Sequence, residues 1–122
     1  MITEAVNRVQ CLYFSPTGST RKVVETVAKG TGMPMTAPIS ITTPQERDSF
    51  SGRSDGGLLI VGVPVYAGRF PALILPPLGK VDGTGRWALP VAVCGNVRMG
   101  TCLAELCAVL TQQGFAIPAA SN

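Results

Sequence analysis

The chain has 122 residues, a formal net charge of +3 and no histidine. Its length suits one domain over residues 1–122, and a composition with 46% hydrophobic and 14% charged residues argues against a disordered chain. No run of Lys and Arg is longer than Arg21-Lys22, which argues against nucleic acid as a partner. The absence of histidine removes the commonest general base and the commonest metal ligand, so we predict no metal site.

The amino end and the cysteines indicate where the protein works. The first residues lack the basic stretch and apolar segment of a signal peptide, and the longest uncharged apolar run, Leu58–Ala67, is about half a membrane span. The four cysteines contain no Cys-x-x-Cys pair, so we interpret them as buried small hydrophobic residues in a reducing compartment. We therefore expect a cytoplasmic protein with no membrane partner.

Five short runs rich in branched or aromatic residues predict strands. In chain order they are Val9–Phe14, Ala37–Thr42, Leu58–Val63, Trp87–Cys94 and Phe115–Ala120. The apolar positions of the first, third and fourth runs are nearly continuous. This pattern is typical of strands buried on both faces of a parallel sheet.

Helical patterns separate these runs. Apolar residues recur at helical spacing from Val23 to Ala28 and again from Leu103 to Leu110. A shorter helix is expected within Pro71–Leu78, where its prolines must end it, and one turn is expected within Gln45–Phe50. Strands that alternate with helices predict an α/β fold, a doubly wound five-stranded parallel sheet with ligands at the carboxyl ends of its strands.

The strongest candidate for a binding site is the segment 15–20, between the first strand and the first helix. Its residues are Ser15, Pro16, Thr17, Gly18, Ser19 and Thr20. Backbone N–H groups and the helix dipole point at an anion at such a junction, three hydroxyls can donate to phosphate oxygens, and the glycine lets the backbone approach closely. Because the Walker and dinucleotide signatures are both absent, the segment suits a terminal monophosphate. The alternative is an ordinary turn capped by Ser or Thr.

Two further loops follow the third and fourth predicted strands, at the same edge of a parallel sheet. The first contains Pro64, Val65, Tyr66, Ala67 and Gly68, and the second contains Cys94, Gly95, Asn96, Met99 and Gly100. The tyrosine of the first loop is placed to stack on a planar ligand. The backbone of the second can hydrogen-bond the edge of a heterocycle, and its methionine can pack on the face. Plain surface turns remain the alternative for both loops.

Together the three loops resemble those of flavodoxins. The pattern Ser15-x-Thr17-Gly18-x-Thr20, preceded by Tyr13-Phe14, is similar to the phosphate loop of that family. The segments 62–71, 93–96, 105–107 and 114–115 resemble, more narrowly, the flavodoxin-like domain at the amino end of EFR1-type ferredoxin (4Fe-4S) proteins. The likeness spans the chain from about Val9 to Ala120, and it implies the strand order 2-1-3-4-5.

The resemblance also implies a cofactor, FMN. Its phosphate would be held by Ser15, Thr17, Gly18, Ser19 and Thr20. Its isoalloxazine would lie between the loops at Tyr66 and at Gly95–Met99. The Ala67–Gly68 peptide matches the one that rearranges toward the flavin N5 on reduction in flavodoxins. Chemistry carried by the cofactor needs no acid or base from the protein, which fits a chain without histidine.

The expected function is therefore electron transfer with a redox protein partner, such as a ferredoxin or an iron–sulfur domain. No acid, base or nucleophile is evident, so an electron carrier is favoured over a substrate-converting enzyme. Two alternatives stay open. One is a flavodoxin-like fold without bound flavin that acts as a dimerisation or partner-binding module. The other is an NAD(P)H-dependent flavin reductase.

The sequence also predicts a homodimer. Flavodoxins close their fold with a helix after the fifth strand, and no helical pattern follows the fifth run here. We expect one face of the sheet, including residues of Leu58–Val63 and Val91–Cys94, to be open to water. An apolar surface of that size favours association with a second copy.

Overall fold

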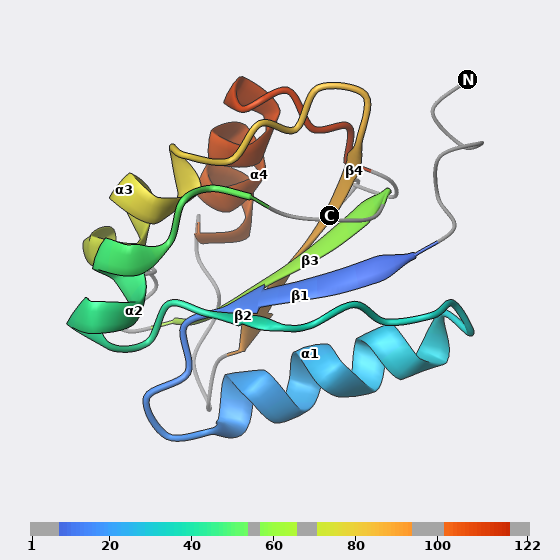
Figure 1. The fold of residues 1–122 in the computed structure, drawn as a ribbon, viewed down its shortest axis with the longest axis horizontal. Helices are drawn as coiled ribbons and strands as arrows, with labels where there is room; N and C mark the ends of the chain where they lie inside the picture. The colour runs from blue at the N-terminus through green and yellow to red at the C-terminus, as the bar shows by residue number, and fades with distance from the viewer. Residues whose placement is uncertain (1–7, 54–56, 66–70, 94–101, 118–122) are drawn as a thin grey trace.

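The computed structural model describes residues 8–53, 57–65, 71–93 and 102–117. A parallel sheet lies at the centre, with helix α1 on one face and α2, α3 and α4 on the other (Figure 1). The strands are β1 (Val9–Tyr13), β2 (Ile39–Ser40), β3 (Leu58–Pro64) and β4 (Trp87–Val93). The helices are α1 (Ser19–Gly30), α2 (Pro44–Ser49), the short 3₁₀ helix η2 (Ala72–Ile74), α3 (Leu75–Leu78) and α4 (Cys102–Gln112).

The strand order confirms the predicted topology for the first four strands. The sheet runs β2-β1-β3-β4, and every pair is parallel. From β1 the chain goes outward to β2 on one side, then crosses to β3 and β4 on the other. The order reverses between β1 and β3, and such a reversal marks the ligand-binding crevice of open α/β sheets, outside the carboxyl ends of the strands.

The fifth predicted strand, Phe115–Ala120, is reduced to a single bridge in the described part of the chain. Ala116 lies beside Trp87, accepting the N–H of Ala88 at 2.9 Å and donating its own N–H to the carbonyl of Arg86 at 2.9 Å. The next rung of a parallel ladder needs the N–H groups of residues 90 and 118. Both are prolines and have no N–H to donate to it. Residues 118–120 of the predicted strand lie outside the described residues.

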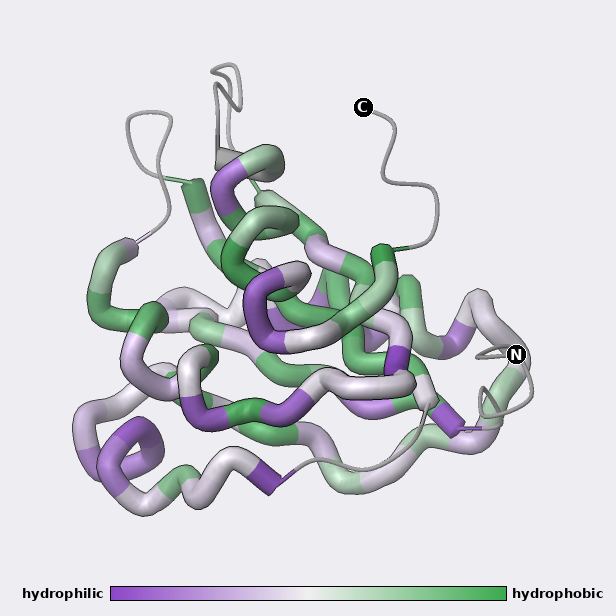
Figure 2. The backbone as a smooth tube through the Cα atoms, turned by 90° about the horizontal axis from the view of Figure 1, so that it is seen from above, coloured by the Kyte–Doolittle hydropathy of each residue, from purple (hydrophilic) through white to green (hydrophobic). Residues whose placement is uncertain are grey.

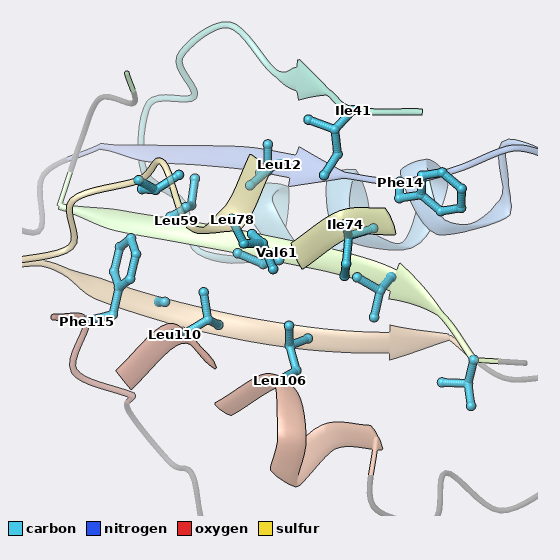
Figure 3. Close-up of a cluster of buried hydrophobic side chains, with 14 residues drawn as sticks. Leu12, Phe14, Ile41, Leu59, Val61, Ile74, Leu78, Leu106, Leu110 and Phe115 are labelled. Atoms are coloured by element: carbon cyan, nitrogen blue, oxygen red, sulfur yellow. The ribbon is translucent and has the colours of Figure 1, made fainter. Parts of the chain in front are cut away.

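The larger apolar cluster lies on the face that carries α3 and α4. Inward-facing side chains of β1 and β3 meet those of the covering helices there, as the close-up of this cluster shows (Figure 3). The labelled residues include Leu12, Leu59, Val61, Ile74, Leu106 and Leu110, each no more than 1% exposed. Figure 2 shows the same arrangement as hydrophobic strands inside and hydrophilic segments on the outer turns. β1 and β3 are thus buried on both faces, as their continuous apolar runs predict, whereas in β4 only Ala88 is buried.

Helix α1 covers the opposite face of β1 and β3. It buries Thr20, Val24 and Ala28, which share one face of the helix at a spacing of four residues. Gly62 of β3 lies beneath this face, where a Cβ would overlap the side chain of Val24. The helix therefore packs closer to the sheet than any residue with a side chain at position 62 would allow.

This close packing corrects one expectation from the sequence. Residues of Leu58–Val63 are not open to water, since Leu58 is 7% exposed and Ile60 is fully buried. On the α1 face, the partly exposed apolar side chains of the sheet belong to β4 instead. They are Trp87, Leu89 and Val91.

Candidate functional site

The segment 15–20 leaves the sheet at the carboxyl end of β1, next to the point where the strand order reverses. Phe14 still donates its N–H to the carbonyl of Gly62 in β3, at 3.1 Å. Gly18 then turns the chain into α1 with a φ of 88°, a conformation that residues with a Cβ rarely adopt. The sequence thus places the amino end of α1 at the carboxyl edge of the sheet, with a glycine at the N-cap.

The first N–H groups of α1 are available to a ligand. Gly18 supplies no side-chain cap, and the third helical N–H, that of Arg21, is taken up by Ser15 Oγ at 3.0 Å. The N–H groups of Ser19 and Thr20 meet no acceptor among the residues that the structure describes. Free donors at a helix amino end, backed by the helix dipole, form an anion site.

The hydroxyls of the segment fit the same ligand. Ser15 Oγ uses a lone pair to accept from Arg21, which leaves its own proton to donate. Thr17 Oγ1 and Ser19 Oγ lie 3.4 Å apart at the exposed tip of the loop. Thr20 is only 2% exposed as a residue, and its methyl group packs against position 62 of β3. Its hydroxyl, like those of Ser15 and Thr17, can donate to an acceptor oxygen of an anion.

The charges around the segment favour an anion as well. The first turn of α1 contains no acidic residue, while Arg21 and Lys22 are both exposed there. Arg21 Nε lies 3.1 Å from Glu25 Oε2, and this salt bridge neutralises part of the charge of Arg21. Cations at a helix amino end oppose the dipole, so this arrangement is electrostatically favourable only with a negative group nearby. The residues present therefore fit the dianionic phosphate of FMN.

The two predicted ring-binding loops start side by side at the same edge. Pro64 of β3 pairs with Val93 of β4, and Val65 donates its N–H to the carbonyl of Val93 at 2.9 Å. The side chain of Val65 packs into the larger apolar cluster rather than standing free. The other predicted ring-contacting residues lie outside the described residues. They are Tyr66, Ala67, Gly68, Cys94, Gly95, Asn96, Met99 and Gly100.

Sequence reasoning missed one participant, Thr42. The N–H of Ser15 donates to Thr42 Oγ1 at 2.9 Å, which ties the candidate loop to the connection between β2 and α2. A local signal for this connection was present, since Thr43-Pro44-Gln45-Glu46 has the form of a capping box. It predicts the start of α2, but it does not predict the contact with Ser15.

Within the described ranges, the cysteines and acidic residues indicate no second chemistry. The Cys11 thiol donates to the carbonyl of Val24 at 3.6 Å, and burial raises the pKa of Cys11, as it does that of Cys107. Neither thiol is therefore a reactive thiolate. Among the described residues, no three His, Cys, Asp or Glu side chains are grouped to hold a metal, and no helix is long and apolar enough to cross a bilayer.

Comparison with known proteins identifies the fold through solved structures, whereas no protein-family model and no curated protein sequence matches the chain. An oxidoreductase from Corynebacterium diphtheriae has a TM-score of 0.69 at 14% identity, over 94% of this chain and 79% of that chain. A mutant flavodoxin from Fusobacterium nucleatum, bound to flavin mononucleotide, has a TM-score of 0.66 at 16% identity, over 94% and 69%. The apo form of an NADH:FMN oxidoreductase has a TM-score of 0.66 at 18% identity, over 92% and 72%.

The chain therefore has a flavodoxin-like fold. Identities of 14 to 18% establish the fold and leave the ligand to be argued from the residues of the site. The narrower resemblance to EFR1-type ferredoxin proteins stays a prediction.

Proposed function

We propose that this chain binds FMN at the carboxyl edge of its sheet and transfers electrons through it. The observation that carries the proposal is the β1–α1 junction. It combines free N–H groups at Ser19 and Thr20 with a glycine N-cap and the hydroxyls of Ser15 and Thr17. The fold supports the same ligand, because one of its structural neighbours is described as a flavodoxin bound to flavin mononucleotide.

In this proposal the residues of the chain bind and orient the cofactor. The N–H groups of Ser19 and Thr20 and the hydroxyls of Ser15, Thr17 and Thr20 hold the phosphate. The loops at Pro64–Gly68 and Cys94–Gly100 hold the ring. FMN, when bound, supplies one- and two-electron redox chemistry, and the protein tunes it through the ring contacts.

A titration of the purified chain with FMN tests the phosphate site. We expect quenching of flavin fluorescence with stoichiometric saturation. Thr17→Val, which removes an exposed loop hydroxyl, should raise the Kd about 10-fold or more, because hydrogen bonds to charged groups contribute about 1.5–3 kcal/mol. Thr26→Val is the matched control, since Thr26 lies on the outer face of the same helix and donates to the carbonyl of Lys22 at 2.9 Å.

Two outcomes would count against the proposal. One is a folded chain, by circular dichroism, in whose presence FMN keeps the fluorescence of free flavin. The other is an equal loss of affinity in Thr17→Val and Thr26→Val, which would place the phosphate elsewhere.

A second candidate function is an NAD(P)H-dependent flavin reductase. It is favoured by the structural likeness to an NADH:FMN oxidoreductase. Bleaching of the bound flavin by NADH alone, without an added reductase, would support it. Bleaching only after a reductase or dithionite is added would favour the electron carrier.

A further inference from the structure

One hydrogen bond joins the segment 15–20 to an element other than its own helix, within the ranges that the structure describes. It runs from the N–H of Ser15 to Thr42 Oγ1, at 2.9 Å, across 27 positions of the chain. Thr42 does not belong to the segment, so its hydroxyl acts on the candidate phosphate site through Ser15.

The hydroxyl of Thr42 belongs to a chain of hydrogen bonds with a fixed direction. Ser40 Oγ lies 2.8 Å from Glu46 Oε1 and 3.0 Å from Thr42 Oγ1. An ionised carboxylate only accepts, so Ser40 donates its proton to Glu46 and is left to accept from Thr42. Thr42 Oγ1 then accepts the N–H of Ser15 with a lone pair. Each hydroxyl in the row thus donates its proton to the next group, and Ser40 Oγ also accepts the N–H of Thr42 at 3.4 Å.

The far end of this row is held firmly. Glu46 also accepts the N–H groups of Thr42 at 3.0 Å and Thr43 at 2.9 Å, and it completes the capping box of α2. Arg47 Nη1 donates to the carbonyls of Ile41 and Thr42, at 3.1 and 2.8 Å. The connection between β2 and α2 is therefore fixed before any ligand binds.

Ser15 connects this row of hydrogen bonds to the candidate phosphate site. Its N–H is held by Thr42, while its Oγ caps the N–H of Arg21 at 3.0 Å. Releasing the first bond lets the backbone at Ser15 rotate, which moves the hydroxyl that borders the free N–H groups of Ser19 and Thr20. Binding sites depend on such supporting contacts, because groups held in place lose less entropy when the ligand arrives.

We propose that Thr42 is a positioning residue for the phosphate loop, so that the preference of the protein for FMN over riboflavin depends on a hydroxyl outside that loop. This inference rests on the proposed function. Riboflavin carries the same ring without the phosphate, and its binding does not involve Ser15. Loss of the Thr42 hydroxyl therefore weakens FMN binding and leaves riboflavin binding unchanged.

The test compares Thr42→Val with two matched variants. Thr42→Ser keeps the hydroxyl, and Thr36→Val removes a hydroxyl on the same β1–β2 side of the molecule whose Oγ1 is buried and has no hydrogen-bond partner. Kd values for FMN and for riboflavin are measured on each protein. Thr42→Val should raise the Kd for FMN about 5- to 10-fold and change that for riboflavin less than 2-fold. Thr42→Ser and Thr36→Val should match the wild type.

A second measurement needs no flavin. Amide hydrogen exchange at Ser15, followed by NMR on the flavin-free protein, should be faster in Thr42→Val than in wild type and Thr36→Val. Unchanged exchange would overturn the inference, and so would equal weakening of FMN and riboflavin in Thr42→Val. Failure of the proposed function gives a different result, because the wild type would then bind neither FMN nor riboflavin, whatever the exchange rate at Ser15. That result would also overturn the role of Thr42 in flavin selectivity.

Discussion

Two glycines set the geometry of the candidate site at the scale of single residues. Gly18 takes the left-handed conformation at the start of α1, with open space where its Cβ would lie, so it is required by its backbone angle. Gly62 has an ordinary backbone angle. A glycine is required there because the side chains of Val24 and Thr20 occupy the space that a Cβ would need. The same residue type therefore serves the site for two different physical reasons.

We expect Gly62→Ala to destabilise the protein by about 1–3 kcal/mol, since an added methyl must push α1 away from β3. Gly30→Ala is the control, because nothing lies within 4 Å of a Cβ at this last residue of α1, and alanine there is neutral or stabilising by up to about 1 kcal/mol. Urea denaturation with a common m-value measures both. Equal stabilities of the two variants would show that α1 packs less closely than described.

At the scale of elements, the connection from β2 to α2 does more than link two pieces of secondary structure. Helix α2 buries none of its own residues, so packing of its side chains does not explain its position. Its capping box, the contacts of Arg47 and a hydrogen bond from Lys80 Nζ to the carbonyl of Phe50 at 2.9 Å hold it instead. A helix held by polar contacts responds to pH more than one held by apolar burial.

Glu46 makes this response testable. Hydrogen bonds, first from the N–H of Thr43 and then from Ser40 and Thr42, lower the pKa of Glu46 below its ordinary value of 4.5. A lowered folded-state pKa means that its stabilisation is fully present above pH 4.5 and is lost as the pH falls through the folded-state value. Unfolding midpoints from pH 7 to pH 3 should therefore fall further for the wild type than for Glu46→Gln.

Asp48→Asn is the control for this measurement, because Asp48 is an exposed acid on the same helix with no hydrogen bond among the described residues. It should keep the pH dependence of the wild type. Hydrogen bonds from Thr84 also lower the pKa of Asp82, and this contribution is common to all three proteins. Parallel pH profiles for the wild type and Glu46→Gln would contradict the role of Glu46.

At the scale of the whole molecule, the apolar surface left on the α1 face is narrower than the sequence suggests. Among the described strands it lies on β4, where Trp87, Leu89 and Val91 are partly exposed. Trp87 is the single tryptophan of the chain, so its fluorescence reports on this surface alone. The homodimer, like the redox partner, stays a prediction, and β4 is where the dimer would form.

If the dimer forms through β4, tryptophan emission should shift to the blue with rising protein concentration, in step with the sedimentation coefficient. Leu89→Lys should abolish both changes, since a charge cannot be buried unpaired in an apolar contact. Val23→Lys is the control on the outer face of α1, where Val23 is 36% exposed. A single monomeric species at every concentration would rule the dimer out.

Prediction from the sequence succeeded where the determinants are local. The β1–α1 junction follows from residues next to one another, and the buried strands follow from continuous apolar runs. The contact of Thr42 with Ser15 was missed because it joins positions 27 residues apart, and no pattern in one sequence pairs them. The fifth predicted strand is tested only as far as residue 117, where Ala116 forms a single bridge with Trp87. Pro90 and Pro118 were visible in the sequence, but their effect on pairing depends on which side of each strand their missing N–H groups would face.

Pro90 also affects the tendency of the protein to aggregate at high concentration. The N–H of Ala88 points away from β3, toward Ala116, so alternation along β4 puts position 90 on the same outer side. An unpaired strand edge normally offers a template on which further chains stack into fibrils. A proline in the middle of that edge interrupts the template. Pro90 therefore opposes polymerisation of the chain through this edge of β4.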